Sequence, residues 1–330
     1  MRIKTQMLKL MLENRDQYIS GAALSKKLSV TRTVAWKAVE SLRAEGYEIA
    51  AATNRGYRLE SCGDILSAAG IESYLRTDGV FQVEVRKTVA STNSALRSLA
   101  AKDAPEGYVL AAGEQTAGKG RRGRGFHSPA GSGAYFSLLL RPCERTGDAA
   151  LITSAAAVAA ARAIEEVFGV RVGIKWVNDL VMGGKKVCGI LTEAVIGMES
   201  GTMESAVLGI GINVTVPEQG FPEGIKGIAA ALTDRSEGSD SERCRLIAAT
   251  LDIFWGYYQD LAGREFLDEY RARSTLLGRD IYIMSLTGDD KKPARAIAID
   301  DNCRLVVRLE NGETITLDSG EVSAATDNGP

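Results

Sequence analysis

The first sixty residues carry apolar side chains at the spacing of short helices. Apolar residues recur every three or four positions in residues 3–11 and again in residues 34–42, which is the period of one helix face. The second stripe comprises Val34, Ala35, Ala38, Val39 and Leu42. Ser20 and Thr31 are suited to cap the second and third helices, because a hydroxyl accepts a hydrogen bond from a free N–H of the first turn. The pattern predicts three helices, the third of which ends at Gly46.

Two strand-like segments, residues 47–51 and 57–59, follow these helices and are joined by the turn sequence Thr-Asn-Arg-Gly. Three helices followed by a small hairpin form a winged helix–turn–helix. In that fold the third helix reads DNA and the hairpin contacts the phosphate backbone or the minor groove. The residues expected to contact DNA are Arg32, Thr33, Lys37 and Arg55. The alternative is a helical protein–protein module with a solvated basic face.

Between Phe81 and Ser274, strand-like runs alternate with helical runs, which predicts an α/β domain with a mixed sheet. The expected strands are residues 81–86, 108–112, 134–140, 172–176, 187–196 and 205–213, and the expected helices are residues 92–101, 148–168, 243–261 and 264–273. Short alternating strands within residues 280–317, with a turn at Gly288, then predict a small SH3-like β-barrel. The chain is therefore expected to be an α+β protein of three domains, residues 1–62, 63–274 and 275–330.

Charge is distributed unevenly along the chain. Residues 1–60 hold 11 Lys and Arg against 6 Asp and Glu, although the whole protein of 330 residues has a net charge of −2. Such an excess within one segment favours nucleic-acid binding by the N-terminal domain alone.

The five cysteines are scattered without CxxC spacing, and His127 is the only histidine. A zinc site, a disulfide framework and a Ser-His-Asp triad are therefore not expected, and free thiols point to a reducing cytoplasm. The most apolar stretch, residues 149–161, is short and alanine-rich, which predicts a buried helix rather than a membrane span. Neither a signal peptide nor a membrane partner is expected.

Residues 118–125 read Gly-Lys-Gly-Arg-Arg-Gly-Arg-Gly, so that four glycines are interspersed with four cations. Glycine lets the backbone approach a ligand closely, while cations and bare N–H groups attract an anion. The run lies between two apolar segments, residues 108–112 and 134–140. This setting favours a mobile loop that closes over an anion inside a folded domain. The alternatives are a flexible surface loop and an RNA-binding segment.

Three further clusters carry chemistry. Ser91-Thr92-Asn93 opens a predicted helix and forms a polar corner, although many such triplets are simple N-caps. Residues 175–179, Lys-Trp-Val-Asn-Asp, suit a metal–phosphate complex at a strand end, or else a tight turn with a salt bridge. In residues 184–191, Gly-Lys-Lys-Val-Cys-Gly-Ile-Leu, Lys186 enters an apolar strand, either to meet an anion or as a surface lysine.

Taken in this order, the clusters resemble the biotin–protein ligase family in its bifunctional bacterial form, which joins a ligase to an operon repressor. The matching pieces are Ser91-Thr92-Asn93, Glu114-Gln115, residues 118–125 with Ser128-Pro129, Lys175-Trp176 with Asn178-Asp179, residues 186–191 and residues 209–213. The resemblance spans the whole chain, and it implies a class II synthetase-like catalytic domain between the winged helix and the barrel.

The resemblance also implies roles for individual residues. Biotin would be held by Ser91, Thr92, Asn93, Gln115, Lys119, Gly120, Arg121, Lys186, Gly189, Ile190 and Gly209. ATP would be held by Arg121, Arg122, Arg124, Phe126, Lys175, Asn178, Asp179 and Asn213. The residues implied to be catalytic are Lys186, Arg121 and Asp179, the last of which would also lie beside Mg²⁺.

The implied activity joins biotin to AMP with ATP and Mg²⁺ and then transfers biotin to a lysine of a biotin carboxyl carrier protein. The winged helix would repress biotin genes by binding operator DNA as a homodimer, with biotinyl-AMP as corepressor. Two alternatives remain open at this stage, namely a biotin-sensing repressor without ligase activity and a lipoate-type ligase.

Four positions depart from the family's usual pattern. Lys119 stands where arginine is common, Val177 where proline is usual, and Phe126 where a tryptophan would cover the adenine. Residues 324–325 lack an arginine expected near the phosphates. Lysine cannot grip a carboxylate with two parallel hydrogen bonds, so the first departure changes the anion site most directly.

Overall fold

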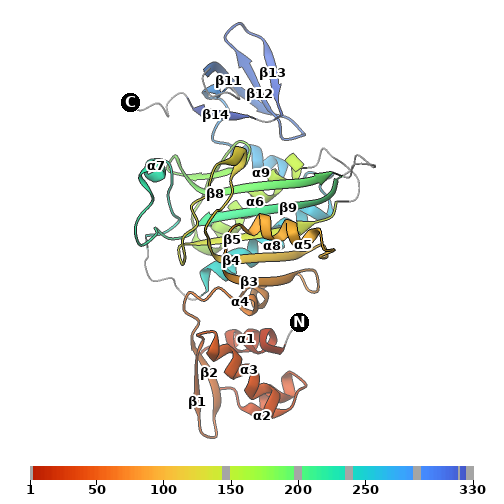
Figure 1. Ribbon diagram of the computed structural model, residues 1–330, viewed down its shortest axis with the longest axis vertical. Coiled ribbons are helices and arrows are strands. Elements are labelled where there is room, and N and C mark those ends of the chain that lie inside the picture. The colour runs from red at the N-terminus through yellow and green to blue at the C-terminus, as the bar shows by residue number, and fades with distance from the viewer. Residues whose placement is uncertain are drawn as a thin grey trace.

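The computed structural model describes residues 3–142, 149–196, 203–234, 241–284, 291–318 and 320–324. Three domains follow one another along the long axis, with the red N-terminal helices at one end and the blue C-terminal strands at the other (Figure 1). The predicted turn at Gly288 lies outside the described residues, as does Ala325. The predicted domain boundaries at residues 62 and 274 stay predictions, and they fall in the connections before α4 and before β10.

The N-terminal domain is the predicted winged helix–turn–helix. Its elements are α1 (Ile3–Glu13), α2 (Gly21–Lys27), α3 (Arg32–Ala44), β1 (Glu48–Ala52) and β2 (Gly56–Ser61). Both predicted caps are confirmed, because Ser20 Oγ accepts from the Ala23 N–H at 3.1 Å and Thr31 Oγ1 accepts from the Val34 N–H at 3.3 Å. Strands β1 and β2 pair antiparallel as the wing.

The apolar stripe predicted for α3 is wrong at one position. Ala35, Ala38, Val39 and Leu42 are buried, but the Val34 side chain is 39% exposed. Its neighbour Trp36 is 50% exposed. Val34 lies one residue before the buried Ala35, so the helical turn of about 100° per residue carries it out of the contact with the other helices.

Helix α4 (Ala68–Tyr74) joins the N-terminal domain to the central domain and packs against both α1 and α8. Its N-cap Ser67 hydrogen-bonds Tyr47 Oη across the junction at 2.8 Å. Gly70 lies so close to its neighbours that a Cβ there would stand 2.8 Å from Cys244 Sγ. The junction is therefore a tightly packed contact rather than an open linker.

The central domain is built on a seven-stranded mixed sheet in the order β3-β4-β5-β9-β8-β7-β6. Its elements are β3 (Gln82–Val89), α5 (Thr92–Ala100), β4 (Tyr108–Gln115), β5 (Gly133–Leu140), α6 (Ala149–Phe168), β6 (Gly173–Lys175), β7 (Asp179–Met182), β8 (Lys185–Ile196), β9 (Met203–Asn213), α7 (Glu223–Lys226), α8 (Glu242–Gln259) and α9 (Leu267–Ala272). Strands β3 and β4 are parallel and the other pairs are antiparallel. The sequence did not predict β7. This strand pairs with β8 across a turn in which Gly183 and Gly184 both have positive φ.

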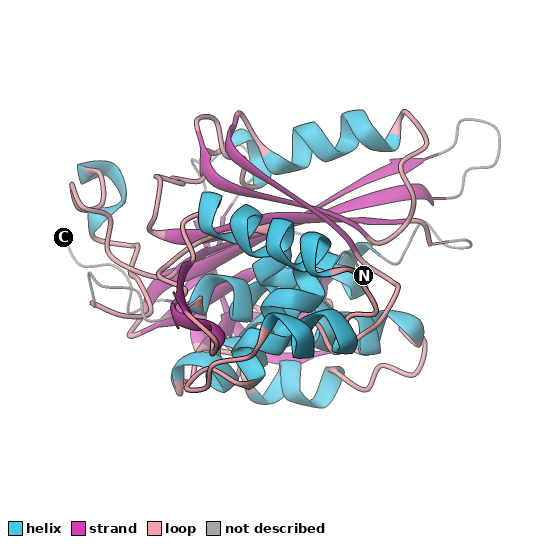
Figure 2. Ribbon diagram, turned by 90° about the horizontal axis from the view of Figure 1, so that it is seen from below, coloured by secondary structure: helices cyan, strands magenta, loops and turns pink. Residues whose placement is uncertain are grey.

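Helices cover both faces of this sheet (Figure 2). Helix α5 covers one face through a small cluster with Leu139 and Val207. Helices α6 and α8 pack together against the other face, which receives Leu138 of β5 and Leu208 of β9. Neighbouring residues of one strand thus enter opposite layers, as the pleat requires. The α5 side holds the site described below.

The C-terminal domain is a five-stranded antiparallel sheet in the order β13-β12-β11-β10-β14. Its strands are β10 (Asp280–Met284), β11 (Lys291–Ile299), β12 (Leu305–Leu309), β13 (Thr314–Leu317) and β14 (Glu321–Ala324). Four of them match predicted strands, and β14 was not predicted. Within the described ranges, no helix combines the length and the apolar character needed to cross a membrane.

We expect Gly70→Ala to destabilise the protein and Gly256→Ala to stabilise it slightly. At Gly70 the added methyl meets Cys244 Sγ at 2.8 Å and Tyr47 Oη at 2.9 Å, and relieving such overpacking costs about 1–3 kcal/mol. Gly256 is exposed in α8, and apart from its chain neighbours and the backbone of its own helix no atom lies within 4 Å of the place that the alanine methyl would take. Alanine favours a helix by about 1 kcal/mol over glycine. Urea unfolding measures both changes, and equal stability of Gly70→Ala and the parent would contradict the packing at this junction.

Candidate functional site

A cavity lies where the N-terminus of α5 meets strands β8 and β9, beneath the glycine- and arginine-rich loop. Its lining comprises Ser91, Thr92, Asn93, Gln115, Lys119, Gly120, Arg121, Phe126, Asn178, Lys186, Gly189, Ile190, Leu191, Gly209, Ile210 and Gly211. Three of these side chains are cations, and among the described residues no carboxylate belongs to the lining. The cavity therefore favours a ligand that carries negative charge.

Glycines form the floor of the cavity. Strand pairing aligns Gly209 of β9 with Ser137 on one side and Leu191 on the other. Two residues further along β9, Gly211 pairs with Gly189, and a Cβ at Gly211 would lie 2.5 Å from the Phe126 ring. The missing side chains leave room for Phe126 to rest directly on the sheet. Phe126 was expected to cover an adenine, and in the structure it packs on this floor.

The polar corner at the start of α5 is ordered by hydrogen bonds. Gln115 Oε1 accepts from the Thr92 N–H at 2.9 Å, and Gln115 Nε2 donates to Ser128 Oγ at 2.9 Å. The Ser128 hydroxyl in turn donates to the Phe126 carbonyl. This chain fixes which end of the Gln115 amide faces the helix.

The glycine- and arginine-rich loop forms a short hairpin in the structure, and its expected mobility stays a prediction. The Phe126 N–H donates to the Gly118 carbonyl at 2.8 Å, and the Gly120 N–H donates to the Arg124 carbonyl at 2.7 Å. At its tip Arg122 adopts φ +55°, a left-handed conformation that favours glycine. The hairpin positions Arg121 toward the cavity and leaves Lys119 exposed.

Arg121 and Lys186 are each held by a polar partner from the β6–β7 region. Arg121 donates to Asn178 Oδ1 at 3.1 Å, and Asn178 Nδ2 donates to the Ile190 carbonyl at 2.8 Å. Lys186 Nζ lies 2.8 Å from Asp179 Oδ1 as an ion pair. Two cations thus reach the cavity, Arg121 from the glycine- and arginine-rich loop and Lys186 from β8, and each is oriented by a neighbour.

The structure brings together every residue expected to hold biotin, since all of them line the cavity. Of the residues expected to hold ATP, Arg121, Phe126 and Asn178 also line it, whereas Arg122, Arg124, Lys175, Asp179 and Asn213 do not. Asn213 Nδ2 donates to the Ala230 carbonyl at 3.0 Å instead. The binding roles themselves stay predictions.

Sequence reasoning missed three lining residues, Leu191, Ile210 and Gly211. All three lie within the strand motifs that carry the family resemblance. A usable signal was the repeated glycine in β9 and β8, because glycine inside a buried strand marks a close approach of another group.

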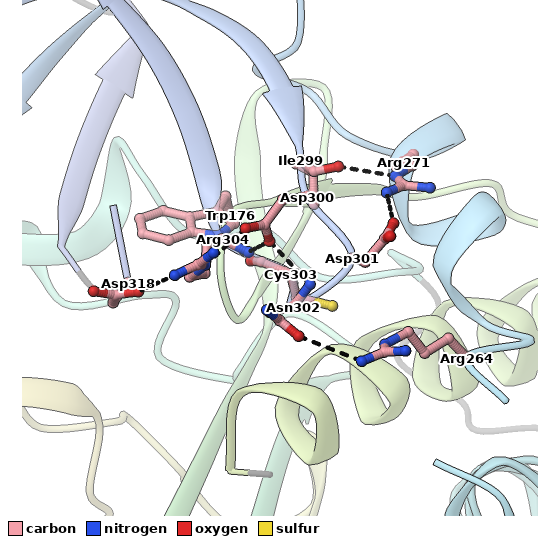
Figure 3. Close-up of polar contacts among 10 residues, drawn as sticks. All are labelled: Trp176, Arg264, Arg271, Ile299, Asp300, Asp301, Asn302, Cys303, Arg304 and Asp318. Carbon is pink, nitrogen blue, oxygen red and sulfur yellow. Dashed lines mark hydrogen bonds and ion pairs between the residues drawn. The ribbon is translucent and has the colours of Figure 1, made fainter. Parts of the chain in front are cut away.

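The segment that holds Asn178 is fixed from the C-terminal domain (Figure 3). The buried indole of Trp176 donates from Nε1 to the Cys303 carbonyl at 2.8 Å, in the turn between β11 and β12. On its other side the Tyr270 hydroxyl donates to the Val177 carbonyl at 3.0 Å. Burial raises the pKa of Tyr270 far above its ordinary value, so this hydroxyl stays a donor at any physiological pH.

The turn that presents the Cys303 carbonyl is itself braced. The Asp300 carboxylate accepts from the Asn302 and Arg304 N–H groups, both at 2.9 Å, and from Arg304 Nε at 2.7 Å. Arg271 of α9 donates to the Ile299 carbonyl at 2.9 Å (Figure 3). The C-terminal domain therefore contributes to the site by holding a loop rather than by lining the cavity.

The site fits a magnesium ion that arrives with a nucleotide. Among the described residues no group of three or more acidic, cysteine or histidine side chains is arranged to hold a metal. Mg²⁺ is commonly bound by one or two carboxylates together with phosphates and water. Asp179 is the carboxylate next to the cavity cations, so it is the residue that would supply such a ligand.

Three segments of the chain match known domain families. Residues 4–58 match a helix–turn–helix domain, residues 85–213 match the biotin/lipoate A/B protein ligase family, and residues 283–324 match the biotin protein ligase C-terminal domain. Fold and site together thus define a ligase of the biotin/lipoate class joined to a DNA-binding module.

Similar proteins narrow this class. The bifunctional ligase/repressor BirA of Bacillus subtilis is 35% identical over 312 residues, which cover 94% of this chain and 95% of the relative. A biotin–[acetyl-CoA-carboxylase] ligase of Mycobacterium tuberculosis is 31% identical over 249 residues, 73% of this chain and 88% of the relative. The solved biotin protein ligase of Aquifex aeolicus in complex with biotin and ATP has a TM-score of 0.61 at 26% identity and covers 74% of this chain and 98% of its own. The chain belongs to the biotin–protein ligase family.

We expect Trp176→Phe to lower the free energy of unfolding by about 1–3 kcal/mol, because the buried Cys303 carbonyl loses its donor. The segment around Asn178 should also loosen, which raises the KM for ATP. Trp36→Phe is the control, since this half-exposed side chain on α3 should change stability by less than about 0.5 kcal/mol. Chemical unfolding and steady-state kinetics measure the two effects, and equal behaviour of both variants would exclude a positioning role for the indole.

Proposed function

We propose that the protein activates biotin with ATP to biotinyl-5′-AMP and transfers the biotinyl group to a lysine of a biotin carboxyl carrier protein. One observation carries this proposal. The cations Lys119, Arg121 and Lys186 share a single cavity with the amides and hydroxyls at the start of α5. Such a lining suits a molecule with a neutral polar head and a carboxylate that must meet a nucleotide phosphate. One relative of this chain is named as a biotin–[acetyl-CoA-carboxylase] ligase, and a similar solved structure is named as a biotin protein ligase in complex with biotin and ATP, which supports the same substrate.

In the first step, a biotin carboxylate oxygen attacks the α-phosphorus of ATP. A new O–P bond forms, the bond to the β-phosphate oxygen breaks, and pyrophosphate leaves. Both partners are anions, so the barrier falls when fixed cations lie where charge accumulates. Arg121, held by Asn178, and Lys186, held by Asp179, are our candidates for this role. Bound Mg²⁺ supplies further charge neutralisation at the phosphates.

In the second step, the amine of the acceptor lysine attacks the acyl carbonyl. The C–N bond forms, the bond to the phosphate oxygen breaks, and AMP leaves while the nitrogen loses a proton. A lysine is mostly protonated at neutral pH, so a base must accept this proton. Asp179 is the carboxylate nearest the cavity cations and is our candidate. The hairpin of residues 118–125 covers the anhydride against water in the interval.

We expect Lys186→Ala to reduce biotin-dependent exchange of pyrophosphate into ATP by about 10²–10³-fold, because a cation is lost where the transition state gains charge. Lys185→Ala is the matched control, since the neighbouring lysine is exposed and lies outside the cavity lining. The exchange assay is run with equal amounts of folded protein.

Two results of this assay would count against the proposal. Wild-type protein that shows no biotin-dependent exchange would point to a biotin-sensing repressor without ligase activity. Exchange that depends on lipoate rather than biotin would point to a lipoate-type ligase.

We further propose that the N-terminal domain binds operator DNA as a homodimer in the biotinyl-AMP-bound state. Arg32, Thr33 and Lys37 are exposed on α3, where a recognition helix meets the major groove. On the wing, the Arg55 guanidinium lies 4.3 Å from the centre of the Tyr18 ring, which holds it in place for a phosphate. One chain carries one such module, and a two-fold operator requires two.

We expect Lys37→Ala to reduce the slope of log K against log salt for operator binding by about 1, as one phosphate contact is lost. Lys226→Ala, on the exposed α7, is the control because it removes the same charge outside the DNA-binding domain and should leave the slope unchanged.

Sedimentation under the same conditions should show a doubled mass only when biotin and ATP are both present. Tight operator binding by a monomer would overturn the dimer proposal.

Cys188, Cys244 and Cys303 are buried and free, and burial raises the pKa of the Cys188 and Cys244 thiols. Buried neutral thiols without disulfides are typical of a reducing compartment, which supports the proposal of a cytoplasmic protein.

A further inference from the structure

The side-chain amide of Asn93 is held from both ends. Its Nδ2 donates to Glu193 Oε2 at 2.9 Å and to the Leu191 carbonyl at 3.3 Å, while its Oδ1 accepts from Ser137 Oγ at 2.6 Å. A carboxylate and a carbonyl can only accept hydrogen bonds, so the nitrogen must face them. The amide cannot turn over without losing these partners, and its oxygen is fixed on the opposite side.

The strands make room for this arrangement. Ser137, Gly209 and Leu191 form one row across β5, β9 and β8, and Asn93 lies over that row. A Cβ at Gly209 would lie 2.0 Å from Asn93 Oδ1, so no other residue type fits beneath the amide. Asn93 and Gly209 both belong to the cavity lining, whereas Ser137 and Glu193 do not. An effect of Glu193 on a ligand therefore acts through Asn93, and an effect of Ser137 acts through Asn93 or through Thr92, which also lines the cavity.

The same network is short of protons. Ser137 Oγ lies 2.6 Å from Asn93 Oδ1 and 2.7 Å from Thr92 Oγ1, and Thr92 Oγ1 lies 3.1 Å from Gln115 Oε1. These are three oxygen–oxygen contacts, but two hydroxyl groups supply only two protons, and both amide oxygens are acceptors alone. One contact is left without a hydrogen. An amide oxygen of the network therefore has a lone pair left for a ligand N–H group, which a ligand head without N–H cannot fill.

We propose that Glu193 and Ser137 are positioning residues, which hold the Asn93 amide with its oxygen toward Gly209 and so select a ligand that carries N–H donors on a cyclic urea. This inference rests on the proposed function and refines its specificity. The ureido ring of biotin has N–H groups on both nitrogens, whereas the dithiolane ring of lipoate has none. The Glu193 carboxylate is kept in place by Arg97, whose guanidinium lies 3.6 Å from Glu193 Oε1.

The test compares biotin with its two analogues methylated at one ureido nitrogen, using calorimetric titration. The variants are Glu193→Ala, Ser137→Ala and Glu193→Gln, and the control is Glu204→Ala, which alters an exposed glutamate on β9. Loss of one hydrogen bond from the Asn93 amide should weaken biotin binding about 10-fold and shrink the preference over an N-methyl analogue by a similar factor. Glu193→Gln keeps an acceptor at this position and should restore most of the preference.

The kinetic readout separates selection from general damage. The KM for biotin should rise while the KM for ATP stays unchanged, since Arg121 and Lys186 are held by Asn178 and Asp179 rather than by the Asn93 amide. An equal loss of affinity for biotin and for both analogues would mean that Glu193 and Ser137 serve only the fold, and it would overturn the inference.

The proposed function and this inference fail in different ways. Wild-type protein that does not bind biotin overturns the proposed function and the inference with it. Wild-type protein that binds biotin, together with unchanged preference in Glu193→Ala and Ser137→Ala, overturns the inference alone. If Glu193→Ala unfolds on heating at a much lower temperature than the parent, the comparison of Ser137→Ala with Glu193→Gln decides the matter.

Discussion

The alternation of side chains along β9 is the constraint on which the rest of the structure depends. Leu208 and Ile212 enter the large core with α6 and α8, while Gly209 and Gly211 face the α5 side and floor the cavity. A shift of one residue in the pairing would exchange these sets, filling the site with branched side chains and leaving voids in the core. The same register therefore serves stability and binding. It also explains why the glycines occur at every second position.

On this floor, the two halves of the site differ in how they are made rigid. The neutral half is braced from within the sheet, through short hydrogen bonds among Asn93, Ser137 and Gln115 and their neighbours. The charged half is braced from outside, because Arg121 rests on Asn178 and the Asn178 segment is held by the Cys303 turn and Tyr270. The polar head of the proposed ligand would thus bind to a preformed surface. Arg121, by contrast, depends on a segment that the C-terminal domain supports. Preorganised groups of both kinds avoid reorganisation costs when the ligand binds.

The sequence predicted much of this, and the reasons for its failures are physical. Apolar periodicity located the long strands and helices, and cap residues such as Thr31 located the start of α3. The short strands β7 and β14 were missed, since four residues show too little alternation to distinguish a strand from a turn. Every residue that the motifs assigned to biotin lines the cavity in the structure. They could not reveal Glu193 or the contact between Trp176 and Cys303, because such partners meet only through the fold, at separations of 100 and 127 residues.

The position of the DNA-binding module limits how the site can influence it. Helix α4 is packed against α1 on one side and α8 on the other, and the buried Arg243 of α8 is bonded to Asp64 at 2.8 Å just before α4. Partial burial raises the pKa of Asp64 even with this guanidinium beside it. Packed contacts such as those of α4 with α1 and α8 do not deform continuously. A ligand in the cavity, on the other face of the sheet, therefore has no flexible hinge through which to move the DNA-binding domain. We therefore infer that control of DNA binding acts through assembly of two chains rather than through a hinge between domains, since assembly needs only that a ligand change the surface around the cavity.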